Sequence, residues 1–258
     1  MLLMFFLIYV RDGTRFTCKS LVIISKKEKH MKTGLNKLFL TVVFSLISVF
    51  SFPQSEIIDI TFLGNCGFFM TDGKINIYLD FPYKSGAYDY MNYDVKLLDS
   101  IQAHSVFLYT HGHADHYSKK LFKKTNQKLY GPWPVTLYLS GKRKYTLNAI
   151  NDSIPNFSIT EFKTKHSYTL KHCSYLIVWN GKRIFISGDA EIADTVCKMR
   201  NLDLVIAPTW LIMDANKRNL KIDTKKIIIC HLRSQQIINN QNPEKIIVLT
   251  QNQKFELK

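Results

Sequence analysis

From residue 57 onward, short apolar runs alternate with polar turns and with a few helical segments. Apolar–polar alternation, or a short apolar run bounded by turn residues, predicts a strand. The predicted strands cover residues 57–63, 68–70, 75–79, 106–109, 128–130, 145–150, 158–162, 175–179, 183–186, 204–207, 227–230, 246–249 and 254–257. Helices are predicted over residues 93–101, 118–124, 190–199 and 234–239. Strand groups interrupted by helices are typical of a layered α/β fold.

Turn dipeptides divide these strands into hairpins. Asp72-Gly73 and Asn180-Gly181 each separate two apolar runs, which is the strongest short-range indication of a hairpin. The last two strands, 246–249 and 254–257, are also expected to pair as a hairpin. Residues 54–258 contain no internal repeat and no linker rich in Pro, Gly or Ser, so we expect them to form a single domain.

The N-terminal part has the pattern of a secretory leader. A short basic segment, Met31–Lys37, precedes fifteen uncharged and mostly apolar residues, Leu38–Phe52. That run is short for a membrane span, which needs roughly 20 residues, and suits a signal peptide. We therefore expect residues 31–53 to be a signal peptide or an N-terminal anchor. Residues 1–30 are then an upstream extension before the true start at Met31, and the protein is exported to the periplasm or secreted.

Composition narrows the function classes further. Of the 258 residues, 46% are hydrophobic and 21% are charged, which excludes collagen-like, low-complexity and disordered chains. Residues 54–258 carry 27 basic and 18 acidic side chains, so their net charge is +9 rather than the +15 of the whole chain. This excess is spread along the chain, and nucleic acid is therefore not an expected partner. A basic cluster at Lys142–Lys144 favours a small anionic substrate. No CxxC pair occurs among the cysteines of residues 54–258, which are Cys66, Cys173, Cys197 and Cys230.

Candidate chemistry is concentrated directly after the predicted strand 106–109. His111, His113, Asp115 and His116 place four possible metal ligands within six residues. Alternation along an extended backbone puts His111 and His113 on one side, while the following turn lets Asp115 and His116 point elsewhere. Imidazole and carboxylate ligands suit Zn²⁺, with Mn²⁺ and Fe as alternatives. The pattern predicts two adjacent divalent cations rather than one.

The segment Thr110–His116 matches the HxHxDH motif of the metallo-β-lactamase superfamily. The segments Ile60–Phe68 and Ile77–Pro82 resemble the opening strands of the branch that contains ascorbate-6-phosphate lactonase-like proteins. A second similar segment is Ile186–Asp189, with its Gly-Asp pair. This resemblance covers most of residues 56–232 and implies an αββα four-layer sandwich with metals at one edge of its two sheets.

The resemblance also implies a ligand set. The first metal takes His111, His113 and a histidine from the middle of the chain, and Asp189 bridges the two metals. The second metal takes Asp115, His116 and a late histidine, which corresponds to His231. Both His166 and His172 are available as the middle histidine. We favour His166, because it follows a predicted strand, whereas His172 leaves little chain before the next strand begins.

The function implied is that of an exported dinuclear hydrolase, with zinc as the expected metal. Its nucleophile is a hydroxide held between the cations, so no Ser or Cys nucleophile is required. Asp115 is the candidate catalytic residue, because it can orient the water and accept a proton. The superfamily includes enzymes acting on lactams, lactones, thioesters and phosphodiesters, so an ester, lactone or phosphodiester-type bond is the expected target. The alternative is a noncatalytic metal- or ligand-binding protein that keeps the scaffold.

Overall fold

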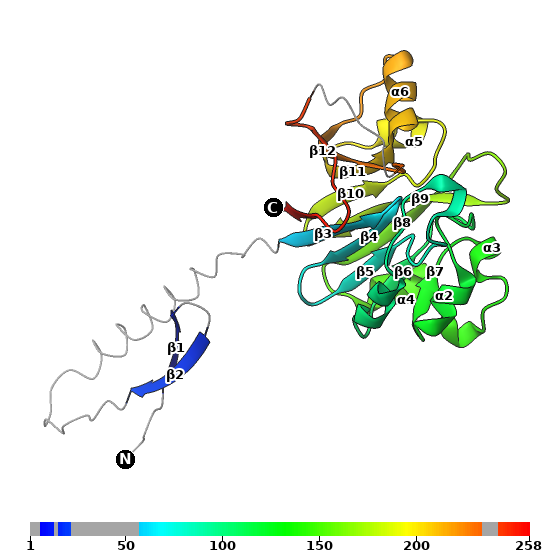
Figure 1. Cartoon of the computed structure of the whole chain (residues 1–258). Helices are drawn as coiled ribbons and strands as arrows, with labels where there is room; N and C mark the ends of the chain where they lie inside the picture. The colour runs from blue at the N-terminus through cyan, green and yellow to red at the C-terminus, as the bar shows by residue number, and fades with distance from the viewer. Residues whose placement is uncertain (1–5, 13–14, 22–56, 234–241) are drawn as a thin grey trace, which may run out of the picture. The chain divides into compact units, whose positions relative to one another are not determined.

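The computed structural model describes two compact units of the chain, Met1–Gln54 and Ser55–Lys258. The described residues are 6–12, 15–21, 57–233 and 242–258 (Figure 1).

In the first unit, strands β1 (Phe6–Asp12) and β2 (Arg15–Leu21) pair as an antiparallel hairpin. The segment 31–53, predicted to be a signal peptide or anchor, lies outside the described residues. Among the helices that the structure does describe, none combines the length and the apolar character needed to cross a membrane.

The second unit contains two six-stranded sheets. The first sheet has the strand order β14 (Lys254–Leu257), β3 (Ile58–Gly64), β4 (Gly67–Thr71), β5 (Asn76–Leu79), β6 (Val106–Leu108) and β7 (Lys128–Tyr130). The second sheet has the order β13 (Ile246–Ile247), β12 (Thr224–Cys230), β11 (Leu202–Pro208), β10 (Lys182–Ile186), β9 (His172–Trp179) and β8 (Phe157–Thr164).

The main core lies between these sheets. Strand β3 alternates buried and partly exposed positions over its first half, so one face of the strand is buried. Strand β9 is buried at seven of its eight positions, as expected for a strand covered on both faces. At one end of the core, Trp179 of β9 donates from Nε1 to Asp72 Oδ2 in the β4–β5 turn, at 3.0 Å. The shared core includes Ile60, Phe62, Met70, Ile177, Trp179 and Ile206.

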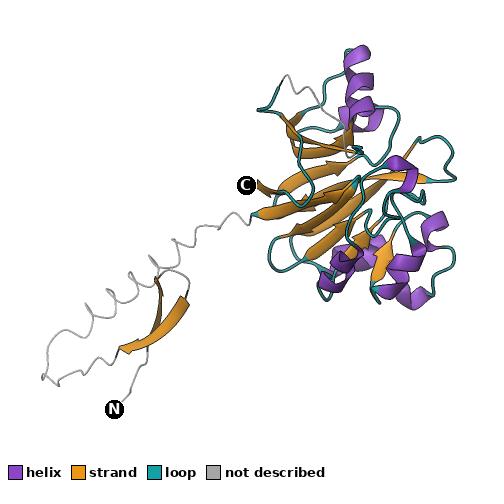
Figure 2. Cartoon of the chain, viewed as in Figure 1, coloured by secondary structure: helices purple, strands orange, loops and turns teal. Residues whose placement is uncertain are grey.

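Helices cover the outer face of each sheet (Figure 2). Phe122 of α2 and Val135 of α3 pack with Phe107 of the first sheet, whereas Leu211 of α6 packs with Val205 of the second. The helices are α2 (Lys119–Lys124), α3 (Trp133–Thr136), α4 (Leu147–Ser153), α5 (Asp194–Lys198) and α6 (Thr209–Lys217), with 3₁₀ segments η1 (Ala87–Asp89), η2 (Val95–Ser100) and η3 (Gly141–Arg143). The predicted α/β sandwich of four layers is confirmed.

Some predicted elements are wrong. Residues 145–150 do not form a strand, because the Thr146 side chain accepts from Ala149 N at 3.1 Å and begins helix α4. The predicted helix 93–101 is the 3₁₀ helix η2, and the helix predicted over 190–199 is limited to α5. The predicted helix 234–239 lies outside the described residues.

The expected C-terminal hairpin is also wrong. Strand β13 pairs in parallel with β12 in the second sheet, whereas β14 pairs antiparallel with β3 in the first. Each strand of the expected hairpin therefore extends a different sheet.

We expect Ile177→Ala to destabilise the fold strongly, because Ile177 is fully buried between the sheets. The loss should be about 2–5 kcal/mol, since truncating a buried isoleucine leaves a cavity that the core fills only partly. The matched control is Ile192→Ala at a position 37% exposed, which should stay within about 0.5 kcal/mol of the wild type. Urea denaturation measures both, and equal losses would contradict this description of the core.

Candidate metal centre

The structure brings together all seven residues that the sequence analysis selected as ligands. Within each of two groups, the possible ligand atoms lie within 4.8 Å of one another. The first group is His111, His113 and His166, and the second is Asp115, His116, Asp189 and His231.

Strand ends from both sheets supply these side chains. Strand β6 of the first sheet leads into the turn of residues 111–116, which is closed by His116 N donating to His113 O at 3.0 Å. In the second sheet, His166 follows β8, Asp189 follows β10 and His231 follows β12. Each group therefore combines side chains from the two sheets.

In the first group, two ring nitrogens face each other across a short gap. His113 Nδ1 lies 3.2 Å from His166 Nε2, while His113 Nε2 lies 3.1 Å from the carbonyl oxygen of Tyr168. Because a carbonyl only accepts, Nε2 of His113 carries the proton, and Nδ1 is left with a lone pair directed at the group. The His111 ring completes the group, with its centroid 4.6 Å from that of His113.

In the second group, one oxygen of Asp189 occupies the central position. Asp189 Oδ2 lies 3.0 Å from His231 Nε2 and 3.2 Å from His116 Nε2. The same oxygen is 3.8 Å from His166 Nε2 and 3.9 Å from His111 Nε2 of the first group. Asp189 Oδ2 therefore lies between the two groups, where a carboxylate shared by two cations would be placed.

Asn65, in the β3–β4 turn, connects Asp115 with His231. Its side-chain Nδ2 donates to the backbone oxygen of Asp115 at 2.8 Å. Its backbone carbonyl oxygen accepts from His231 N at 2.9 Å. His231 has a left-handed backbone (φ 60°), which is uncommon for a residue other than glycine and is frequent at functional sites. In this conformation, His231 Nε2 lies 3.2 Å from Asp115 Oδ2.

Asp80, which no sequence pattern singled out as a site residue, orients two of the imidazoles. Its Oδ2 accepts from Thr110 Oγ1 at 2.7 Å and from His116 Nδ1 at 2.9 Å. Thr110 Oγ1 also lies 3.1 Å from His111 Nδ1 and can accept its proton. In their neutral forms, both rings therefore carry the proton on Nδ1 and direct an unprotonated Nε2 at the centre, the tautomer that a metal ligand requires. Asp80 lies within the segment Ile77–Pro82 that carries the resemblance, and its place after an apolar strand was the further signal that could have indicated a role.

His172, the alternative ligand in the sequence analysis, has both ring nitrogens bonded within the protein. Nε2 accepts from Asp189 N at 2.9 Å, and Nδ1 lies 2.8 Å from Thr164 Oγ1. Burial lowers the pKa of His172 to about 3, so the ring is neutral at neutral pH. In this geometry His166, and not His172, is positioned to complete the first group.

The donor set fits divalent cations. The buried Nε2 atoms of His111 and His116 have no hydrogen-bond partner of good geometry among the described residues, and Nε2 of each points at the centre. Burying such atoms without a partner is costly, and a cation satisfies them. The set of five imidazoles and two carboxylates is suited to Zn²⁺, Mn²⁺ or Fe²⁺.

Charges within the second group are strongly coupled. Burial raises the pKa of Asp189, but the neighbouring His116 and His231 outweigh it and hold the pKa well below its usual value. For His116, burial lowers the pKa, while Asp189 and Asp80 raise it further, to well above its usual value. Asp115 and Asp189 raise the pKa of His231 in the same way, against burial.

The first group has the opposite tendency. Burial and the nearby His116 hold the pKa of His111 well below its usual value. Burial also lowers the pKa of His166. In the absence of a cation, His111 and His166 are therefore neutral at neutral pH, whereas His116 and His231 of the second group retain protons to higher pH.

Aromatic rings cover His231 from two directions. The Tyr90 ring lies edge-on with its centroid 4.2 Å away, and the Trp210 ring lies at 4.8 Å. Tyr90 is reached through Tyr88 and Asp89, which both have left-handed backbones (φ 54° and 63°). The sequence analysis did not select Tyr90, because no pattern distinguishes it from the other tyrosines of this loop.

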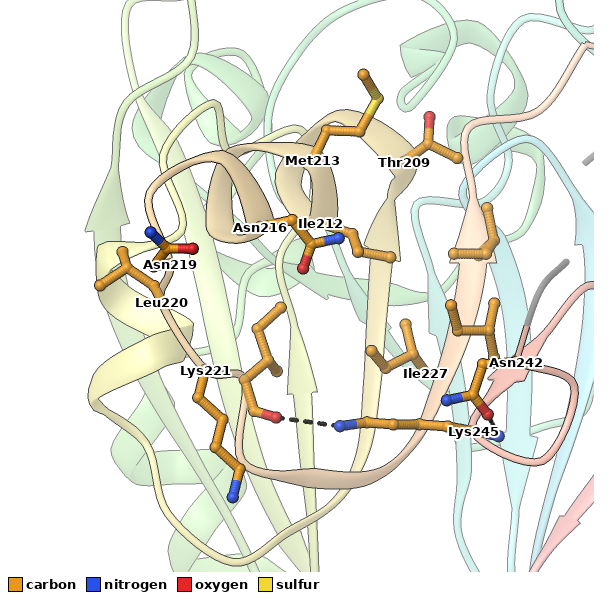
Figure 3. Close-up of a pocket in the computed structure, with 13 residues that line it drawn as sticks. Thr209, Ile212, Met213, Asn216, Asn219, Leu220, Lys221, Ile227, Asn242 and Lys245 are labelled. Atoms are coloured by element: carbon orange, nitrogen blue, oxygen red, sulfur yellow. Dashed lines mark hydrogen bonds between the residues drawn. The ribbon is translucent and has the colours of Figure 1, made fainter. Parts of the chain in front are cut away.

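One cavity lies away from this cluster. It measures about 720 Å³ and lies between α6 and β12, with Ile212, Met213, Leu220, Ile227 and Lys245 among its lining residues (Figure 3). None of the seven clustered residues lines it.

Fold and site together define a metallo-β-lactamase fold with a His/Asp cluster at the edge of its sheets. No family model matches the sequence, and no curated protein matches it. Solved structures do match. The metallo-β-lactamase fold protein YhfI from Bacillus subtilis aligns with a TM-score of 0.58 and 15% identity, over 78% of this chain and 99% of that chain.

Two other solved structures are similar to the same extent. Igni18, a metallo hydrolase from the archaeon Ignicoccus hospitalis, aligns with a TM-score of 0.56 and 14% identity, over 78% of this chain and 99% of that one. An isothiocyanate hydrolase from Delia radicum gut bacteria aligns with a TM-score of 0.55 and 12% identity, over 76% and 98%. At these identities, the likeness shows the fold.

We expect cations to displace more protons from His116 and His231 of the second group than from His111 and His166 of the first. A cation binds only the deprotonated ring, and the raised pKa values of His116 and His231 mean that these rings hold protons below those values. Calorimetric titration of metal-free protein with Zn²⁺ at pH 7, in buffers of different ionisation enthalpy, should show greater proton release in one of two steps.

The variant Asp80→Asn tests the source of this proton release. Removing the Asp80 charge lowers the pKa of His116, so fewer protons should be released per cation at the same pH. Equal release in both proteins would contradict the assignment of the charged imidazole.

Proposed function

We propose that this chain is a metal-dependent hydrolase that holds two divalent cations, most favourably Zn²⁺, in the cluster. The observation that carries the proposal is the position of Asp189 Oδ2, which lies within 3.9 Å of ring nitrogens from both groups. A buried carboxylate shared by two sets of imidazoles is suited to two adjacent cations, whose charge it offsets. Igni18, a metallo hydrolase, and the isothiocyanate hydrolase share this fold and support the same function.

His111, His113 and His166 would hold one cation, and Asp115, His116 and His231 the other, with Asp189 between them. Cations bound there would acidify a water molecule and stabilise the negative charge that develops during hydrolysis. The chain itself fixes the tautomers of His111 and His116 through Thr110 and Asp80.

Asp115 is the residue proposed to orient the attacking water and accept its proton. Burial raises the pKa of Asp115, but His231 and His116 lower it further, so the carboxylate is ionised at neutral pH. Asn65 Nδ2 donates to the backbone oxygen of Asp115 at 2.8 Å and also approaches Asp115 Oδ2 at 3.4 Å, so it holds the residue beside the centre. Tyr90 and Trp210 cover His231 and limit the approach of solvent on that side.

The scissile bond is proposed to be an ester, lactone or phosphodiester. The resemblance to ascorbate-6-phosphate lactonase-like proteins favours a lactone, but the fold alone does not select among these substrates. An anionic substrate was expected from the basic cluster Lys142–Lys144. However, Arg143 donates to the carbonyl oxygens of Gln127 and Phe122 and so fastens the end of α2. Arg143, the central residue of that cluster, therefore has a structural role, and the panel of substrates described below tests the charge of the substrate.

The protein as isolated should contain about two divalent cations per chain by elemental analysis and should hydrolyse members of a panel of esters, lactones and bis-p-nitrophenyl phosphate. Chelation should abolish turnover, and added Zn²⁺ or Mn²⁺ should restore it. Asp115→Asn should lower kcat by about 100-fold or more, because it removes a positioned base.

Asp152→Asn, an exposed position on α4, is the matched control and should keep full activity. Two cations with no turnover on any substrate class would instead support a noncatalytic metal-binding protein. One cation or none would contradict the dinuclear proposal.

We further propose that residues 31–53 direct export. N-terminal sequencing of the protein recovered from its own cells should place the first residue after the apolar run 38–52. Recovery of an intact segment 2–29 would contradict export from Met31, and retention of residues 31–53 in the membrane fraction would favour an anchor.

A further inference from the structure

The segment Ser187–Asp189 is held by a continuous chain of hydrogen bonds outside the cluster. Asp189 N lies 2.9 Å from His172 Nε2, and His172 Nδ1 lies 2.8 Å from Thr164 Oγ1. Thr164 Oγ1 lies 2.9 Å from Ser174 Oγ, which in turn donates to Ser187 O at 2.7 Å. The chain thus starts and ends on the backbone of the same short segment.

Every proton in this chain has one consistent position. A backbone N–H only donates, so His172 Nε2 must accept and the neutral ring carries its proton on Nδ1. Nδ1 then donates to Thr164 Oγ1, and the Thr164 hydroxyl donates to Ser174 Oγ. Ser174 donates its own proton to Ser187 O, which closes the chain. His172 and Ser174 are buried, so water does not compete for these bonds.

Steric contact adds a second restraint at Gly188. Its backbone is left-handed (φ 53°), and a Cβ added there would lie 2.6 Å from His172 Nε2 and 2.7 Å from Thr110 Cβ. The imidazole and Thr110 therefore pack directly against the backbone that precedes Asp189. Thr110 also belongs to the hydrogen-bond network that orients His111 and His116, so Asp189 is placed relative to those rings.

The side chain of Asp189 is restrained separately from its backbone. Cys66 Sγ lies 3.9 Å from Asp189 Oδ1, within the range of a weak thiol hydrogen bond. Oδ2 is then left for His116 and His231.

We propose that His172 is a positioning residue, locked by Thr164 and Ser174, that fixes Asp189 so that Oδ2 lies between the two groups. His172 binds no cation in this proposal, because its Nε2 lone pair is used by Asp189 N. This proposal rests on the proposed function in one respect, because it assumes that Asp189 binds cations.

The test compares Thr164→Val, His172→Ala and His172→Gln with Thr169→Val. Thr164→Val removes the hydroxyl that receives the His172 proton. Thr169→Val is the matched control, because its hydroxyl lies on the same β8–β9 connection and, among the described residues, donates to Lys171 O outside this chain of hydrogen bonds. His172→Gln can still present an oxygen acceptor to Asp189 N, whereas His172→Ala cannot.

Competitive titration with a chromophoric chelator measures both Zn²⁺ affinities. Thr164→Val and His172→Ala should reduce the lower of the two Zn²⁺ affinities by roughly 10–100-fold. This is the range found when partners that orient metal ligands are removed. His172→Gln should recover part of that loss, and Thr169→Val should match the wild type. Unchanged affinities in His172→Ala, in a wild type that binds two cations, would overturn the proposal.

The visible spectrum of the Co²⁺-loaded protein separates positioning from ligation. At saturating Co²⁺, His172→Gln should keep the wild-type band positions and intensities, because no ligand is lost. A changed coordination spectrum at full occupancy would make His172 a ligand and overturn the proposal.

A metal-free measurement keeps the proposal distinct from the proposed function. In metal-free protein, ¹⁵N NMR should show His172 protonated on Nδ1, and exchange of the Asp189 amide hydrogen should be at least tenfold faster in His172→Ala than in Thr169→Val. A protein that binds no metal but shows both results would keep His172 as the positioning residue of Asp189 and would contradict only the hydrolase proposal. The opposite tautomer of His172, or equal exchange rates of the Asp189 amide in the two variants, would overturn the positioning role of His172.

Discussion

The burial of Asp189 and Asp115 among imidazoles is the constraint on which the site depends. Both carboxylates are only 3% exposed, and burying charge without compensation is costly. The structure meets this cost partly with His116 and His231, and within the described part of the chain it leaves His111 Nε2 without a hydrogen-bond partner. The strand ends of both sheets must meet at one edge for this compensation to exist. The αββα arrangement brings these strand ends together, so the charge compensation at the site depends on how the two sheets pack.

Local patterns in the sequence were sufficient for much of this result. The apolar runs located most strands because burial between two layers imposes long apolar segments on them. The spacing of His111, His113, Asp115 and His116 predicted a metal-binding cluster, because four possible ligands within six residues seldom occur together for another reason. His166, Asp189 and His231 were located by resemblance together with their positions directly after predicted strands, and the structure places them beside that turn.

What the sequence did not predict depends on tertiary contacts. The apolar pattern of β13 and β14 gives no indication of which sheet each strand joins, and the two strands separate. Asp80 and Asn65 are single polar residues whose roles arise from partners at least 30 positions away. His172 shares its residue type with the ligand candidates, and only the hydrogen bond from Asp189 N distinguishes it. In residues 145–150, a single threonine cap outweighed an apolar pattern that suited a strand.

The connection between β8 and β9 has a consequence for how such a protein changes over time. It runs from His166 of the cluster to His172, which accepts from Asp189 N, and between them Tyr168 and Leu170 are fully or largely exposed to solvent. Exposed loop tips tolerate replacement far better than packed strands do. Mutation can therefore change these exposed residues between His166 and His172 at little cost to the fold, while the packed strands on either side stay the same.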